Sequence, residues 1–123
     1  MKLLLFVGVG SFIGGILRYL LSQFIQTKFL STFPYGTLTV NILGCLVIGL
    51  VLALSERTSM TPEWRLFLAT GICGGFTTMS AFSSETFSML REGQLWNASA
   101  YVLASLILCI FATFIGYFIP KLF

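Results

Sequence analysis

The sequence contains no histidine, and only 9% of its 123 residues are charged. The acidic residues are few and far apart: Glu56, Glu63, Glu85 and Glu92. Histidine and clustered carboxylates supply most metal centres and most general acid–base sites, so neither kind of site can be assembled from sequence neighbours here. We therefore expect that the protein is not an enzyme.

Cysteine is also scarce. Cys45, Cys73 and Cys109 each occupy a different apolar block, and none has the close spacing of a metal-binding or redox motif. We expect buried, inert thiols.

Basic residues outnumber acidic ones by seven to four, but they are dispersed rather than clustered, which argues against nucleic-acid binding.

Hydrophobic residues are abundant, at 57% of the chain, and they form long blocks between short polar connections at about 26–35, 55–62 and 91–97. This pattern is typical of integral membrane proteins. We predict one all-α transmembrane domain over residues 1–123, with four spans at about 3–24, 36–54, 63–90 and 98–119. The first block opens like a signal peptide, but it is longer than one and carries Arg18, so we interpret it as a span.

The third predicted span contains an unusually polar stretch at residues 70–89. Glycines cluster over residues 71–75, Thr77 and Thr78 follow, and serines come next. Because unpaired backbone is costly in hydrocarbon, irregular backbone within a span indicates a binding or conduction site. We predict a helix broken at mid-membrane, with the break at residues 71–78. The alternative is a kinked helix whose glycines only let neighbouring helices approach.

The first span combines small residues with a charge. Gly10 and Gly14 have the spacing that lets two helix backbones touch. Arg18 follows one turn later, and a charge at a helix centre costs roughly 2.5–3.5 kcal/mol on insertion scales. Arg18 either extends to the lipid headgroups or belongs to an electropositive vestibule.

Polar residues also share one face of the second and of the fourth span. In the second, Thr37 and Asn41 lie one turn apart, with Thr39 between them. In the fourth, polar residues recur every fourth position: Tyr101, Ser105, Cys109, Thr113 and Tyr117. Side chains at this spacing are neighbours on a helix. They either join helices by hydrogen bonds or line a pathway.

The positive charges are nearly balanced between the two sides of the predicted bundle. One side receives Lys2, Arg57, Arg65 and Lys121, and the other receives Lys28 and Arg91, with Arg18 nearer the second side. So small a bias does not fix one orientation. We therefore expect insertion in both orientations, and a two-fold antiparallel homodimer that buries the polar faces and brings two broken helices together.

The polar set favours an anion as the permeating species, because it supplies donors and positive potential. The donors are Thr37, Thr39, Asn41, Thr77, Ser80, Tyr101, Ser105 and the Arg18 guanidinium. Phe82 can add the electron-poor edge of its ring. A cation pathway would need acids or carbonyls, and only Glu85 qualifies, although carbonyls freed at the break could hold a hard cation statically.

Three motifs resemble the Fluc (CrcB) fluoride-channel family. They are G-x-x-x-R-Y at residues 14–19, G-T-L-x-x-N-x-x-G at 36–44 and G-x-x-G-G-x-T-T-x-S-x-F at 71–82. The resemblance implies a fluoride-selective channel for passive export, with two pores in an antiparallel homodimer. It also implies a multi-pass protein of the bacterial inner (plasma) membrane, with fluoride and lipid as partners and no organic cofactor.

The resemblance also assigns roles to residues. It implies a structural sodium ion at the dimer interface, held by backbone carbonyls of Gly74 and Thr77 of both subunits. Asn41 would line the pore, and Arg18 would lie near its wet mouth. The polar track of the fourth helix matches Tyr101, Ser105 and Cys109, with a thiol where a hydroxyl is expected. Glu85 matches a family acid whose role is left open.

The sequence departs from the family pattern at one important place. The family usually has T-T-F-S-T-F, and this chain has Met79 in place of the first phenylalanine and Ala81 in place of the second threonine. Met79 still shares a helix face with Phe82 but offers no ring edge. We expect a retained pore with an altered ion position or conductance.

Two alternatives remain open. A small multidrug transporter also has four spans and can form antiparallel dimers, but it depends on an acid in its first helix, where this chain has Arg18 instead. The second alternative is a non-transporting membrane subunit, in which the polar residues only join helices.

Overall fold

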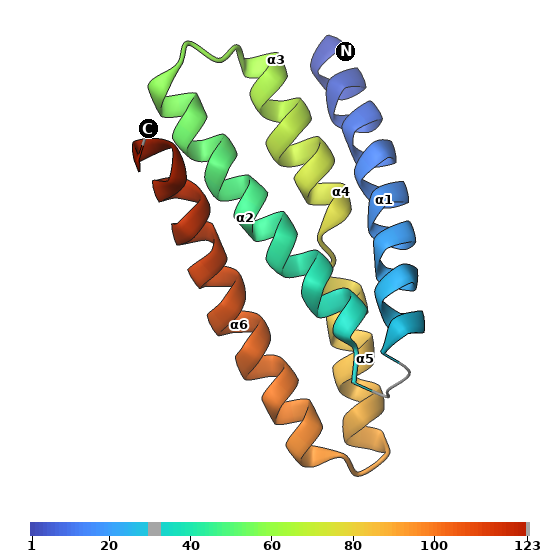
Figure 1. Cartoon of the computed structure of the whole chain (residues 1–123). Coiled ribbons are helices and arrows are strands. Elements are labelled where there is room, and N and C mark those ends of the chain that lie inside the picture. Colours follow the sequence, from blue (N-terminus) through green and yellow to red (C-terminus); the bar gives the residue numbers. More distant parts are fainter. Residues whose placement is uncertain (30–32, 123) are drawn as a thin grey trace.

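The computed structural model describes residues 1–29 and 33–122, and over these residues every regular element is a helix (Figure 1). The elements in order are α1 (Lys2–Lys28), α2 (Tyr35–Arg57), α3 (Pro62–Arg65), η1 (Leu66–Cys73), α4 (Gly74–Phe76), α5 (Met79–Arg91), α6 (Leu95–Phe118) and η2 (Ile119–Leu122). Part of the connection predicted at 26–35, residues 30–32, lies outside the described residues.

Four helices are long and apolar enough to cross a membrane: Lys2–Lys28, Tyr35–Arg57, Pro62–Arg91 and Leu95–Leu122. The prediction of an all-helical chain with four long apolar helices is confirmed. Each helix extends beyond its predicted span by one to four residues at nearly every end, because polar residues continue the helical hydrogen bonding past the apolar block.

The third long helix is a chain of α3, η1, α4 and α5. Pro62 occupies its first turn, and the Thr61 hydroxyl accepts a hydrogen bond from the backbone N–H of Trp64. This is the usual way in which an orphan N–H at a helix start is satisfied. Residues 66–73 then form a π-helix, a wider turn that is rare and often occurs at functional sites.

Successive long helices alternate in direction, so both termini lie at the same end of the bundle (Figure 1). α2 and α6 therefore run parallel and pack closely. A Cβ added to Gly49 would lie 2.2 Å from the carbonyl oxygen of Thr113, and one added to Gly116 would lie 2.1 Å from that of Leu46. Only glycine allows the two backbones to approach this closely.

α1 packs in the same way against the third long helix. A Cβ on Gly10 would lie 2.7 Å from the carbonyl oxygen of Phe67, and a Cβ on Gly14 would lie 2.2 Å from that of Ile72. The close approach predicted from the spacing of Gly10 and Gly14 is confirmed. Van der Waals contact between backbones is what holds helices together where lipid removes the hydrophobic drive.

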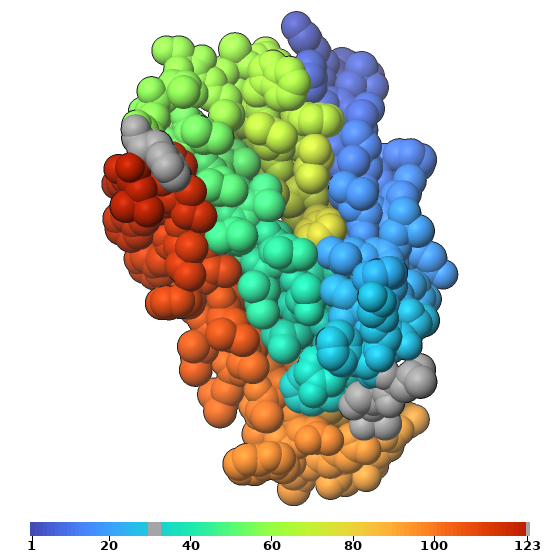
Figure 2. Space-filling model, in the orientation of Figure 1, coloured from blue at the N-terminus to red at the C-terminus, as the bar shows by residue number. Residues whose placement is uncertain are grey.

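Most of the apolar surface is left uncovered. Only 11% of the most apolar part of α1 is buried inside the chain, and 17% of that of α6. The exposed fraction of the side chain is 70% for Phe12 and 60% for Phe111. On the face drawn in Figure 2, α2 lies between α6 and α1. A surface of this kind is stable only against lipid or another protein.

Candidate functional site: the helix break and its cavities

The third long helix is interrupted at two residues. Thr77 has φ −84° and ψ 154°, and Thr78 has φ −147° and ψ 118°, so both are extended between α4 and α5. The interruption is narrower than the predicted range of 71–78, because the glycines at 71–75 keep helical geometry. Two of them serve packing instead: a Cβ on Gly75 would lie 2.6 Å from the carbonyl oxygen of Ser11, and one on Gly71 would lie 3.0 Å from Gly10.

Asn41 of α2 occupies the gap in the helix. Its Oδ1 accepts a hydrogen bond from the backbone N–H of Thr78 at 2.9 Å, and its Nδ2 donates to the Thr78 carbonyl at 3.4 Å. The carboxamide thus replaces the pairing that a continuous helix would give Thr78. An amide nitrogen carries two hydrogens, so one donor of Asn41 is left over for another acceptor.

The interruption also releases carbonyl groups. In a continuous helix the N–H of Thr78 would bond to the carbonyl of Gly74, and the N–H of Ala81 to that of Thr77. Here the Thr78 N–H donates to Asn41, and the Ala81 N–H donates to the Thr78 hydroxyl at 3.2 Å. The carbonyls of Gly74 and Thr77 are therefore removed from helical pairing at the predicted sodium site.

A cavity of about 280 Å³ adjoins the interruption, between α2, α5 and α6. We call it the break cavity. Its lining residues are Asn41, Cys45, Thr77, Thr78, Met79, Phe82, Ser105, Leu106, Cys109 and Ile110. Five residues that the sequence predicted for a pathway, from three different helices, therefore meet in one space: Asn41, Met79, Phe82, Ser105 and Cys109.

Ser105 is the most unusual group in this lining. Its side chain is buried, and among the described residues its hydroxyl has no hydrogen-bond partner. A buried polar group without a partner costs free energy unless something else binds it. The hydroxyl of Ser105 is thus available to a guest of the break cavity.

Aromatic rings form one wall next to the cavity. The rings of Phe82 and Tyr101 lie 5.1 Å apart between centroids, tilted by 44°, and Phe33 packs edge-on against Tyr101. Tyr101 is completely buried. Met79, by contrast, is 71% exposed, so the thioether lies at the edge of the structure where a second subunit or lipid would cover it.

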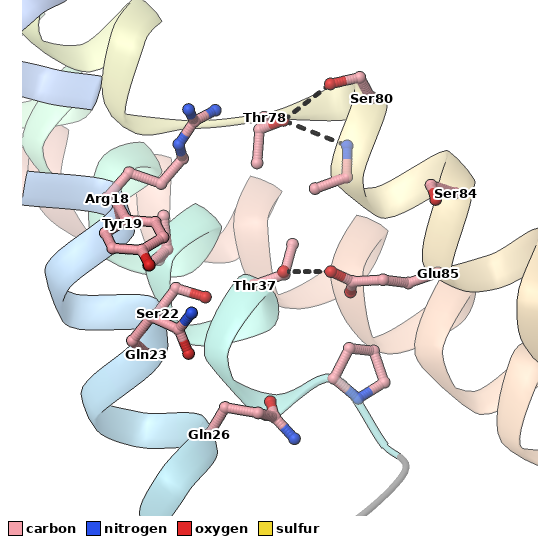
Figure 3. A pocket seen from close by; sticks show the side chains of 13 residues that line it. Arg18, Tyr19, Ser22, Gln23, Gln26, Thr37, Thr78, Ser80, Ser84 and Glu85 are labelled. Atoms are coloured by element: carbon pink, nitrogen blue, oxygen red, sulfur yellow. Dashed lines mark hydrogen bonds between the residues drawn. The ribbon is translucent and has the colours of Figure 1, made fainter. Parts of the chain in front are cut away.

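A larger cavity, about 790 Å³, opens on the other side of the interruption (Figure 3). We call it the Arg18 cavity. It is lined mostly by polar side chains, including Arg18, Ser22 and Gln23 from α1 and Ser80, Ser84 and Glu85 from α5. No described side chain forms an ion pair with Arg18. The cavity therefore contains a guanidinium charge without a direct counter-ion.

Glu85 is held by two hydroxyls. The Thr37 hydroxyl donates to Glu85 Oε1 at 2.6 Å, and the Tyr101 hydroxyl donates to Glu85 Oε2 at 3.1 Å (Thr37 in Figure 3). Hydrogen bonds to a carboxylate are the stronger kind. Both hydroxyls thus point at Glu85. The two hydrogen bonds connect α2 and α6 to α5.

The remaining predicted residues lie elsewhere. Gly74 and Thr77 line a separate cavity of about 190 Å³ between α2 and the third long helix. Thr39 is half-buried and is absent from the described linings of these three cavities. The predicted pathway residues therefore fall mainly into two groups: Arg18, Thr37 and Ser80 line the Arg18 cavity, and Asn41, Met79, Phe82, Ser105 and Cys109 line the break cavity. Thr77 lines both the break cavity and the cavity beside Gly74.

Sequence reasoning missed two residues of the site. Thr78 links Asn41 to the start of α5, and Cys45 lines the break cavity. Threonine is a common residue just before the first turn of a helix, where its hydroxyl accepts a hydrogen bond from a free backbone N–H. The Thr78 cap of α5 could therefore have been predicted. Cys45 lies one turn after Asn41, so the sequence places it on the face of Thr37 and Asn41, but it does not show that this face meets α6.

The chain has many relatives of similar length. One from Chlorobium phaeobacteroides is 43% identical over 121 residues, which is 97% of this chain and 93% of the relative. One from Flavobacterium psychrophilum is 40% identical over 122 residues, which is 98% of each, and one from Shewanella baltica is 40% identical over 116 residues, which is 94% of each. All three are named fluoride-specific ion channel FluC.

A family model described as "CrcB-like protein, Camphor Resistance (CrcB)" matches residues 5–117. That range contains all four long apolar helices except their outermost turns, together with the interruption and every residue of the break cavity. By this match and by its full-length relatives, the chain belongs to the CrcB family.

Proposed function

We propose that this protein is a fluoride-selective channel that lets fluoride leave the cell passively, through two pores in an antiparallel homodimer. The observation that carries the proposal is the buried hydroxyl of Ser105, which lacks a partner and lines a cavity together with the Asn41 amide and the Phe82 ring. The names of the relatives support fluoride as the ion.

The pathway begins at the Arg18 cavity. Its guanidinium raises the local concentration of anions, because positive potential in a cleft attracts them. Ser80 and the remaining donor of Asn41 lie next along the interruption. Fluoride is small and strongly hydrated, so each lost water must be replaced by a donor, and the break cavity provides Ser105 and the ring edge of Phe82.

Cys109 and Met79 give the inner part of the pathway a softer lining than hydroxyls and rings would. Thiol and thioether groups are weak hydrogen-bonding partners. We therefore expect weaker retention of fluoride at this level and a conductance that differs from that of relatives with a ring at the position of Met79.

Glu85 has a positioning role in this proposal. By accepting a hydrogen bond from each hydroxyl it fixes the rotamers of Thr37 and Tyr101, and Tyr101 in turn supports the ring of Phe82. The carboxylate charge is shared over two donors, which reduces its repulsion of a passing anion.

A structural sodium ion fits the carbonyls of Gly74 and Thr77. Hard cations take oxygen ligands, and these two carbonyls are released from helical pairing. Two subunits related by a two-fold axis would each contribute the pair. When bound, the ion would supply positive charge that holds the two interruptions together; the chain's own part is to keep the carbonyls unpaired through Asn41 and Thr78.

The proposed antiparallel dimer rests on three observations. Most of the apolar face of α1 and α6 is uncovered, and Met79 beside the break cavity is exposed. The positive charges at the two ends of the bundle are nearly balanced, which permits both orientations. In this arrangement the interruption lies at mid-membrane, and the protein is a multi-pass component of the bacterial inner membrane.

The membrane potential provides the driving force. An inside-negative potential favours anion exit by about 2.3 kcal/mol per 100 mV for one charge. No fuel and no catalytic step are needed for this exit.

Fluoride efflux from reconstituted liposomes tests this function. Liposomes loaded with potassium fluoride and containing the purified protein should release fluoride rapidly to an electrode once valinomycin allows potassium to follow. Liposomes loaded with chloride should release their anion far more slowly. Fluoride release no faster than from protein-free liposomes would reject the channel, and equal release of chloride would reject the selectivity.

A further inference from the structure

The break cavity contains three sulfur-bearing side chains from three helices. They are Cys45 of α2, Met79 of α5 and Cys109 of α6. Cys45 and Cys109 line this one cavity from α2 and α6, and both cysteines are free and half-buried. The sequence alone places these thiols in separate apolar blocks; the parallel packing of α2 and α6 brings them to the same level.

We propose that Cys45 and Cys109 bind a soft monovalent metal ion of the Cu(I) class, with the Met79 thioether as a third ligand, and that the bound ion closes the anion pathway. The closing part rests on the proposed channel function; the binding part does not.

The ligand set selects this class of metal. Thiolate and thioether sulfur prefer soft ions such as Cu(I), whereas Mg²⁺ and Ca²⁺ require oxygen ligands. Among the described residues, no group of three or more histidine, cysteine or acidic side chains is arranged to hold a metal. A tetrahedral zinc site is therefore not offered here. Two thiolates suffice for a monovalent d¹⁰ ion, which readily accepts two-coordinate geometry.

The charge balance explains why binding would stop an anion. Two thiols lose two protons to solvent and gain one monovalent cation, so two neutral groups become one bis-thiolate complex with a net charge of −1. In a narrow, largely apolar space this charge repels fluoride strongly. The ion also occupies part of a cavity of only about 280 Å³ beside Phe82.

Cys73 provides a matched control on the same protein. It is buried on the third long helix and lines the cavity of about 190 Å³ beside Gly74, not the break cavity. Cys45 lines both cavities, so replacing Cys73 also tests a rival site made of Cys45 and Cys73. A metal that bound to any cysteine of the chain would depend on Cys73 as much as on the pair.

Silver(I) is a suitable probe, because it shares the ligand preference of Cu(I) without its redox chemistry. Purified protein in detergent and nitrate buffer, free of chloride, should bind one silver ion per protomer by isothermal titration and elemental analysis. Cys45→Ser and Cys109→Ser should each weaken binding by more than about 10-fold, since loss of even an outer-shell partner costs that much. Met79→Leu should weaken it less, and Cys73→Ser should leave it unchanged.

The flux arm uses the same variants in liposomes, each compared with its own silver-free rate. Silver should stop fluoride release by the wild-type protein but not by Cys109→Ser, and an excess of a small thiol should reverse the block.

Silver binding that survives in Cys45→Ser and Cys109→Ser, or that is lost equally in Cys73→Ser, would overturn the site. Binding through the pair with unimpeded fluoride release would overturn the closing role. If the wild-type protein released no fluoride, the channel function would fail while the titration still decided the site.

Discussion

The carboxamide of Asn41 pairs with both backbone polar groups of Thr78, at 2.9 Å for the N–H and 3.4 Å for the carbonyl. A side chain on α2 thus replaces the backbone hydrogen bonds that Thr78 would make in a continuous helix. This pairing leaves the carbonyls of Gly74 and Thr77 without their helical donors. The same contact therefore stabilises the interruption, frees the carbonyls of the proposed sodium site and leaves one amide hydrogen of Asn41 for another acceptor.

Replacing Asn41 by alanine should destabilise the protein by about 1–3 kcal/mol, because the half-buried Thr78 would lose the partner of its N–H. Thermal unfolding in detergent, followed by the fluorescence of Trp64 and Trp96, measures this. Fluoride efflux should fall as well. Asn97→Ala is the matched control, since within the described residues the Asn97 side chain bonds only to Gln94 at the start of α6. Equal melting temperatures for the two variants would contradict the assigned role of Asn41.

Replacing Phe82 by isoleucine should cut fluoride efflux severely and leave the proposed dimer intact, because the ring edge beside the break cavity is lost while apolar volume is kept. Phe87→Ile is the control: Phe87 lies on the same helix but is 61% exposed and belongs to none of the cavities described here. Efflux assays measure the fluoride flux, and size-exclusion chromatography measures the oligomeric state. Unchanged efflux in Phe82→Ile would remove Phe82 from the pathway.

Replacing Met79 by phenylalanine restores the ring that the family usually has. We expect faster fluoride efflux than in the natural sequence, because a fixed ring edge replaces a flexible thioether in the lining. Met79→Leu is the control, since it removes the sulfur without adding a ring. If phenylalanine and leucine changed the rate alike, the ring at this position would have no specific part in conduction.

Replacing Glu85 by alanine should lower the melting temperature, with a loss of about 1–3 kcal/mol, because the buried hydroxyls of Thr37 and Tyr101 lose their shared acceptor. Glu85→Gln keeps one acceptor oxygen and nearly the same shape, so its loss should be smaller. Tyr101→Phe in the background of Glu85→Ala should then cost little more. Additive losses in the double variant would show that the two side chains are not coupled.

Two neighbouring glycines of α1 give a sharp test of the packing. An added Cβ at Gly14 would lie 2.2 Å from the Ile72 carbonyl oxygen, whereas one at Gly15 would meet nothing within 4 Å. Gly14→Ala should therefore destabilise the protein by about 1–3 kcal/mol through overpacking, and Gly15→Ala should be neutral or slightly stabilising. The melting temperatures of the two variants test this prediction. Equal melting temperatures would mean that α1 does not approach the third long helix this closely.

The sequence by itself determined the membrane character, the four long apolar helices and the close approach of α1 through Gly10 and Gly14. These properties follow from apolar block length and from residue size, which act locally and need no knowledge of partners. The broad location of the interruption also followed from local composition. Its width did not, because the glycines of residues 71–75 were free to serve either an irregular backbone or close packing, and only the neighbouring helix α1 selects the second.

Only the tertiary structure decided which polar groups meet. Asn41 and Thr78 are 37 residues apart, and Thr37 and Glu85 are 48 apart. Hydropathy fixes that a helix spans the membrane, but not its rotation about its own axis or its level relative to its neighbours. Those two quantities turn Thr37 and Tyr101 toward Glu85, and they bring Cys45 and Cys109 into the lining of one cavity.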